Sequence, residues 1–165
     1  MKKNTTRNLT VAAMLSAVAF ILMFIEFPIP MLIPSFVKMD FSDLPELLAA
    51  FAYGPLAGVA VAGIKNLIHL PLSSSMYVGE LSNFLLGATF AFIAGLIYKH
   101  HKNRTGALWG SVAGAATMAL ISLPINYFIV YPAYVVLYGL PLEGIVGMYE
   151  AIPVSYTHLR AHETV

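Results

Sequence analysis

Long hydrophobic stretches without charges alternate with short polar segments along this chain. A helix needs roughly 20 apolar residues to cross the hydrocarbon core of a membrane, and several stretches approach that length. Gly54-Pro55 interrupts one of them and predicts a tight turn, with Pro55 at the first position of the next helix. We therefore expect helices at about 8–27, 41–53, 56–70, 81–98 and 106–131.

The fifth of these helices lies in a stretch, 105–142, that carries no charge and is too long for one untilted span. Pro124 is expected to kink the helix, because proline lacks the backbone donor and clashes with the preceding turn. The kink frees backbone groups, and we expect it to leave Asn126 exposed.

The C-terminal end of the chain departs from the hydrophobic pattern. A sixth helix should begin near Leu142, but the pattern ends at Ile152-Pro153. The run SYTHLRAHET in the last residues looks like a translated sequencing-adapter tail. We therefore predict an all-α membrane protein, a six-helix transmembrane bundle over 1–153 whose sixth helix is truncated, followed by a non-native tail over 154–165.

Composition supports an integral membrane protein. The chain is 59% hydrophobic and only 10% charged, with a mean hydropathy of +0.78, whereas an average soluble domain is about 25% charged. The sequence contains no cysteine, which excludes disulfides and thiolate metal sites. A net charge of +1 argues against a nucleic-acid partner, which usually requires a basic face.

Basic residues gather at two places, the N-terminus with Lys2, Lys3 and Arg7, and the loop 99–104. The positive-inside rule places both in the cytoplasm of a multi-pass protein of the plasma membrane. The loops around 38–43 and 73–75 then share the outer face. Within 99–104 the two histidines are adjacent and would point apart on a helix, so we expect no metal site there.

Several polar residues interrupt the apolar helices and leave two interpretations each. Lys65 either snorkels or pairs with Asp43 or Glu46, or it faces a ligand. Glu80 and Asn83 are three residues apart and share a helix face, where they either cap the helix or contact a ligand.

Small and aromatic residues mark two further helix faces. Ala13 and Ala17 form a small-xxx-small pair, which either packs inside the bundle or lets a partner helix approach closely. At the outer end of the fifth helix, tyrosines form either a membrane-interface belt or a stacking platform for a planar ligand. These tyrosines are Tyr127, Tyr131, Tyr134 and Tyr138.

The stretch VKMDFSDLPELLAAFAYGPLAGVAVAGIKNLIH, supported by GELSNFLLG and AAMLSA, carries a family resemblance. Over about residues 8–153 the chain resembles the substrate-binding S component of energy-coupling factor vitamin transporters, most closely the riboflavin-specific type. The resemblance implies a six-helix bundle that binds one vitamin near the outer face. It also implies docking on a shared transmembrane subunit with two ATPase subunits, and no catalysis or cofactor.

The resemblance assigns roles to particular residues. Ala13 and Ala17 match the docking motif of the first helix, and Asn126 resembles an asparagine that pairs with the flavin ring. The family's polar residues of helix six have no counterpart at Pro153-Val154-Ser155. The candidate cargo-binding residues, which include a lid-like loop, are Phe36, Val37, Lys38, Met39, Asp40, Tyr77, Glu80, Asn83, Asn126, Tyr127 and Tyr131.

Two other functions are compatible with these residues. One is an S component for a different vitamin or precursor, with the same fold and another pocket. The other is a membrane enzyme or scaffold that binds a metal through its acidic loop, which would require Asp40, Asp43 and Glu46 to converge on one cation.

Overall fold

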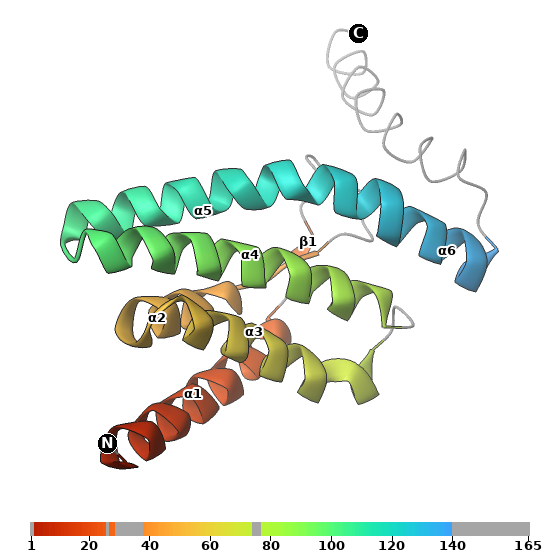
Figure 1. The fold of residues 1–165 in the computed structure, drawn as a ribbon. Coiled ribbons are helices and arrows are strands. Elements are labelled where there is room, and N and C mark those ends of the chain that lie inside the picture. The colour runs from red at the N-terminus through yellow and green to blue at the C-terminus, as the bar shows by residue number, and fades with distance from the viewer. Residues whose placement is uncertain (1, 26, 29–37, 74–76, 140–165) are drawn as a thin grey trace, which may run out of the picture.

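The computed structural model describes residues 2–25, 27–28, 38–73 and 77–139, and this part of the chain is helical apart from one pair of two-residue strands (Figure 1). The elements in chain order are α1 (Lys2–Met23), β1 (Phe27–Pro28), β2 (Lys38–Met39), α2 (Asp43–Tyr53), α3 (Pro55–His69), the 3-10 helix η1 (Leu70–Leu72), α4 (Val78–His100), α5 (Arg104–Ile125), the π-helix η2 (Asn126–Val130) and α6 (Tyr131–Tyr138).

Four helical stretches in the described residues are long and apolar enough to cross a membrane. They are Thr6–Met23, Pro55–Leu72, Val78–His100 and Arg104–Leu137. Large apolar side chains on these stretches face outward, among them Leu9, Leu56, Leu108 and Trp109, each more than 60% exposed. In water this much exposed apolar surface would be strongly unfavourable, whereas in lipid it is the expected outer face of a bundle.

Helix α2 is short because two signals bound it closely. Asp43 and Glu46 stand in its first turn, where carboxylates interact favourably with the helix dipole. Gly54 ends it with a φ of 101°, a conformation that favours glycine, and Pro55 begins α3 as predicted. Eleven residues span only about 16 Å, so α2 does not cross a bilayer alone. It lies instead against α1, α3 and α4.

Small residues let the central helices approach closely. A Cβ placed on Gly58 of α3 would lie 2.8 Å from the Cβ atoms of both Ala50 and Ala91, so three helices meet at this glycine. A Cβ on Gly110 of α5 would lie 2.8 Å from the carbonyl oxygen of Ala94 on α4. In lipid, such close packing takes the place of the hydrophobic driving force between helices.

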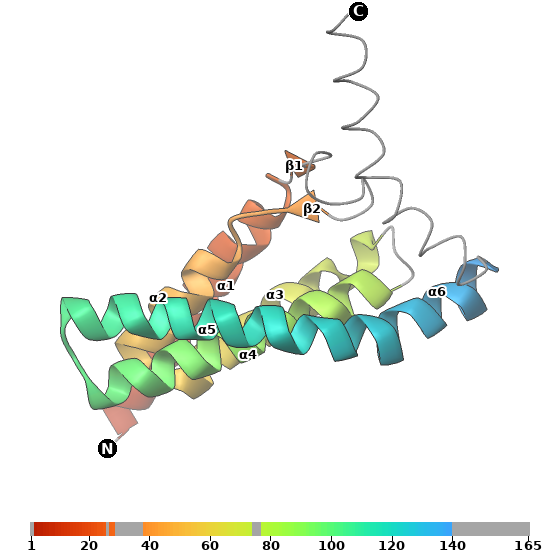
Figure 2. The same ribbon diagram turned by 90° about the horizontal axis from the view of Figure 1, so that it is seen from above.

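The two ends of the proline-rich segment after α1 pair with each other as short strands. Strands β1 and β2 pair antiparallel, with Phe27 opposite Met39 and Pro28 opposite Lys38, and Figure 2 shows them beyond the C-terminal end of α1. The sequence pattern predicted only a loop here, because a two-residue strand leaves no periodic signal. Residues 29–37 lie outside the described residues.

The fifth helix is longer than predicted. Helices α5, η2 and α6 follow one another without a break from Arg104 to Tyr138, and Pro124 lies within α5 just before the π turn. Asn126 is half-buried rather than exposed as predicted, because η2 packs against α4. The predicted sixth helix from Leu142 and the predicted tail 154–165 lie outside the described residues.

Candidate functional site

A buried lysine is the centre of the polar interior. Lys65 of α3 is fully buried, and its Nζ atom lies 2.5 Å from Glu46 Oε1 and 3.1 Å from Asp43 Oδ1 on α2. It also donates a hydrogen bond of 2.5 Å to the hydroxyl of Ser42. The structure thus decides between the two interpretations of Lys65, since the ammonium group pairs with both of the predicted carboxylates.

The acidic loop does not form a cation site of its own in the described residues. Asp43 and Glu46 turn toward Lys65, and a carboxylate oxygen of Asp40 instead accepts a hydrogen bond of 2.6 Å from the backbone N–H of Ser42. No group of three or more His, Cys, Asp or Glu side chains that could hold a metal occurs in the described part of the chain. The cation that Asp43 and Glu46 bind is therefore Lys65, and Asp40 does not join them.

A second polar cluster joins α3 to the start of α4. Glu80 is 6% exposed, its Oε1 atom lies 3.0 Å from His69 Nδ1, and its Oε2 atom accepts a hydrogen bond of 2.6 Å from Ser73. The His69 ring also contacts, edge-on, the ring of Phe20 on α1 and the ring of Phe24 just after α1. Glu80 therefore links the start of α4 to the end of α3, and His69 extends this cluster to the end of α1.

Two asparagines lie next to this cluster. Asn66 Nδ2 donates a hydrogen bond of 2.9 Å to the carbonyl oxygen of Ala62 and lies 3.5 Å from Asn83 Oδ1 on α4. The Oδ1 atom of Asn66 is buried and has no hydrogen-bond partner within the described ranges. The sequence analysis did not select Asn66 or His69. Their spacing could have indicated a polar site, because polar residues three apart on an apolar helix share one face.

The remaining predicted cargo-binding residues fall into three groups. Asn126 and Tyr131 are half-buried where η2 and the start of α6 follow α5, and η2 packs against α4. Tyr77 and Tyr127 are each 61% exposed, and Tyr77 has a left-handed φ of 70° that is rare for a bulky residue. Lys38 and Met39 form β2, while Phe36 and Val37 lie outside the described residues.

The small pair of α1 faces outward. Ala13 and Ala17 are exposed, whereas Ser16 and Ala19 on another face of the helix are buried against the bundle. Ala19 packs in a small apolar core with Ala49 and Val61. The outward pair is therefore not used for packing within the described residues.

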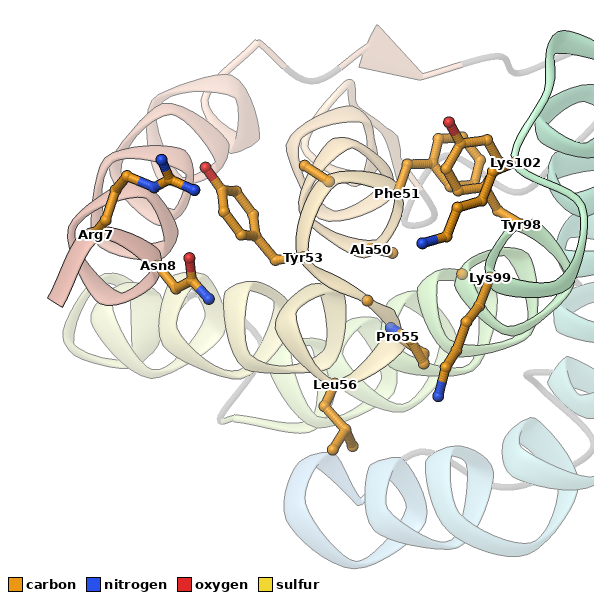
Figure 3. Close-up of a pocket in the computed structure, with 13 residues that line it drawn as sticks. Arg7, Asn8, Ala50, Phe51, Tyr53, Pro55, Leu56, Tyr98, Lys99 and Lys102 are labelled. Carbon is orange, nitrogen blue, oxygen red and sulfur yellow. The ribbon is translucent and has the colours of Figure 1, made fainter. Parts of the chain in front are cut away.

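A cavity of about 530 Å³ lies at the other end of the bundle (Figure 3). It is formed by the start of α1, the α2–α3 turn and the end of α4. Its lining residues are Arg7, Asn8, Ala50, Phe51, Ala52, Tyr53, Gly54, Pro55, Leu56, Gly95, Tyr98, Lys99 and Lys102. Glu80 and Lys99 stand 19 residues apart on α4, so this cavity is roughly 28 Å from the polar cluster around Glu80.

Comparison with known proteins decides the family. The sequence model of a family described as the ECF transporter, substrate-specific component, matches residues 7–160. The chain belongs to this family. An S component is part of a transporter rather than an enzyme, and the chain is accordingly a membrane protein.

Individual relatives agree with this assignment. This chain is 41% identical over 134 residues to the riboflavin transporter RibU of Staphylococcus aureus. The alignment covers 81% of this chain and 70% of the relative. The chain is 38% identical over 131 residues to the riboflavin transporter FmnP of Bacillus subtilis, covering 78% and 68%. A solved structure of the S component of a bacterial ECF transporter matches with a TM-score of 0.73 and 35% identity, covering 98% of this chain and 99% of that one.

We expect Lys65→Met to destabilise this S component strongly, by about 3–5 kcal/mol, because it leaves the Glu46 carboxylate buried without its partner. The double variant Lys65→Met/Glu46→Leu should recover most of the loss, since a buried ion pair can be replaced by apolar side chains of similar volume. Thermal unfolding in detergent measures both effects. Arg104→Met, which removes an exposed cation far from Lys65 in the sequence, is the control and should change the midpoint little. Equal destabilisation in the single and double variants would contradict the pairing.

Proposed function

We propose that this chain is the riboflavin-binding subunit of an ATP-driven vitamin importer in the cell membrane of a prokaryote. The observation that carries the proposal is the 38–41% identity to two proteins named as riboflavin transporters, within a family of substrate-specific components. The chain captures the vitamin at the outer face and docks on a coupling module made of a transmembrane subunit and two ATPase subunits. It has no catalytic role and needs no cofactor.

The arrangement of polar side chains supports riboflavin as the ligand. A flavin is a planar aromatic ring with donors and acceptors along its edge, and it suits an apolar site with a few placed polar groups. Asn83 of α4 and Asn126 of η2 are half-buried, and their two elements pack against each other. Asn66, whose Oδ1 atom lacks a partner in the described residues, is the neighbour of Asn83. We assign these amides, with Tyr131, to the flavin edge and face.

The segment from 36 to 40 is assigned to a lid over the ligand. Strand β2 holds its second half beside β1, and Asp40 is fixed by its hydrogen bond to Ser42 at the start of α2. The proposed lid therefore ends next to the Lys65 cluster, so the ion pairs that position α2 also position this end of the lid.

Asn126→Ala should weaken riboflavin binding by roughly 5- to 150-fold, because a flavin donor or acceptor left unsatisfied costs about 1–3 kcal/mol. We would measure this by riboflavin fluorescence quenching in a version whose residues 154–165 are replaced by a family-like sixth helix. The chain with its own residues 154–165 should bind more weakly than either protein, because several contacts are missing. Asn8→Ala, an amide at the opposite end, is the control and should not change the affinity.

Two results would count against these assignments. If the folded version with the replaced sixth helix does not quench riboflavin, the proposed ligand is wrong. If the chain with its own residues 154–165 binds as tightly as that version, the assignment of 154–165 as a non-native tail is wrong.

Ala13→Trp/Ala17→Trp should abolish vitamin uptake while leaving riboflavin binding intact. The two alanines are exposed on α1, where large side chains would block close approach of a partner helix without entering the bundle. Riboflavin binding by the purified variant and uptake by cells carrying the whole transporter separate the two effects. Loss of binding together with intact assembly would refute the docking role.

The N-terminus and the loop 99–104 should both be cytoplasmic. They lie at the same end of the bundle, and both are rich in basic residues (Figure 1). Single cysteines placed at Asn4 and Asn103 should resist a membrane-impermeant maleimide in intact cells and react after lysis. If either position is labelled in intact cells, the predicted orientation is wrong.

A further inference from the structure

Positive charge is concentrated at the end of the bundle opposite the polar cluster around Glu80. Arg7, Lys99 and Lys102 line the cavity there, and no carboxylate is among its lining residues. The acidic side chains in the described ranges all lie before or within the first turns of α2 and α4. They are Asp40, Asp43, Glu46 and Glu80.

The cations at this cavity have no partner of opposite charge in the described part of the chain, whose ion pairs involve only Lys65 and His69 as cationic members. Arg7 and Asn8 reach the cavity from α1, Lys99 from α4 and Lys102 from the loop after it. In Figure 3 the Arg7 guanidinium points toward the Tyr53 ring, and the two lysines stand on the other side of Tyr53. The cavity therefore presents several donors and an uncompensated positive charge.

The same cavity has an apolar edge. Leu56 lines it and is 74% exposed, and Pro55 and Phe51 are also among its lining residues. Tyr53 and Tyr98 add the amphipathic rings that are enriched at membrane–water interfaces. A small soluble anion would use only the cations, whereas a ligand with a charged head and a hydrocarbon tail would use both parts.

We propose that this cavity binds the phosphate headgroup of an anionic phospholipid from the adjacent leaflet, with an acyl chain along Leu56. Basic pockets between transmembrane helices are suited to such headgroups. The site is separate from the proposed riboflavin site and does not depend on the identity of the cargo. It holds the ends of α1, α2 and α4 at the level of the lipid headgroups.

The test is native mass spectrometry of the full chain in detergent, titrated with phosphatidylglycerol or phosphatidylcholine of the same acyl chains. We expect tighter binding of phosphatidylglycerol. Lys99→Gln should weaken it about fivefold, the effect expected for one basic residue near an anionic lipid. Arg104→Gln removes one exposed cation from the same end but outside the cavity, and it should leave the affinity unchanged. Unchanged thermal midpoints establish that both variants are folded.

Two further experiments distinguish a specific lipid site from nonspecific charge attraction and from a site for soluble anions. Ala52→Phe keeps every charge but fills part of the cavity, and it should weaken phosphatidylglycerol binding as well. Inorganic phosphate at millimolar concentration should compete only weakly. The proposal is overturned if phosphatidylcholine binds equally well, if Lys99→Gln and Arg104→Gln have equal effects, or if Ala52→Phe has none. It is also overturned if inorganic phosphate displaces the lipid completely, which would indicate a soluble-anion site.

Discussion

The burial of Lys65 is the constraint on which the centre of this bundle depends. An ammonium group in an apolar helix is unfavourable unless it is paired, and here Asp43 and Glu46 of α2 and Ser42, the residue before α2, all bind it. This requirement fixes how α2 lies against α3, although α2 is too short to cross the membrane by itself. A Cβ on Gly87 of α4 would lie 2.6 Å from Glu46 Oε2, so the same carboxylate also sets how closely α4 can approach.

Close packing and buried polarity act together in this S component. The glycines and alanines bring α2, α3 and α4 near enough for short side chains to bond across helices, as at Asn66 and Asn83. Larger residues at Gly58 would separate the helices and break the polar contacts that depend on the short distance. The polar clusters in turn select one register of the helices, because an apolar surface alone would tolerate sliding.

The two ends of the bundle differ in chemistry, and the difference matches the proposed functions. Amides and a buried glutamate lie where α4 begins and α5 ends, which suits a neutral, planar ligand with a hydrogen-bonding edge. Interfacial tyrosines and cations that have no carboxylate partner among the described residues surround the cavity where α4 ends, which suits an anionic headgroup. Helix α4 contributes residues to both proposed sites, so a change in its tilt would move residues at each site.

The sequence by itself determined the helical membrane class, the Gly54-Pro55 turn and the two possible partners of Lys65, because these follow from local composition and spacing. The prediction that Asn126 is exposed was wrong, since this residue is half-buried, and the sequence pattern did not predict the strand pair that follows α1. Only the tertiary structure decided which helix faces meet. The contact of His69 with Glu80, and the lining of one cavity by both Arg7 and the end of α4, depend on how each helix is rotated and crossed. Those angles are set by packing between residues far apart in the chain, which no local pattern encodes.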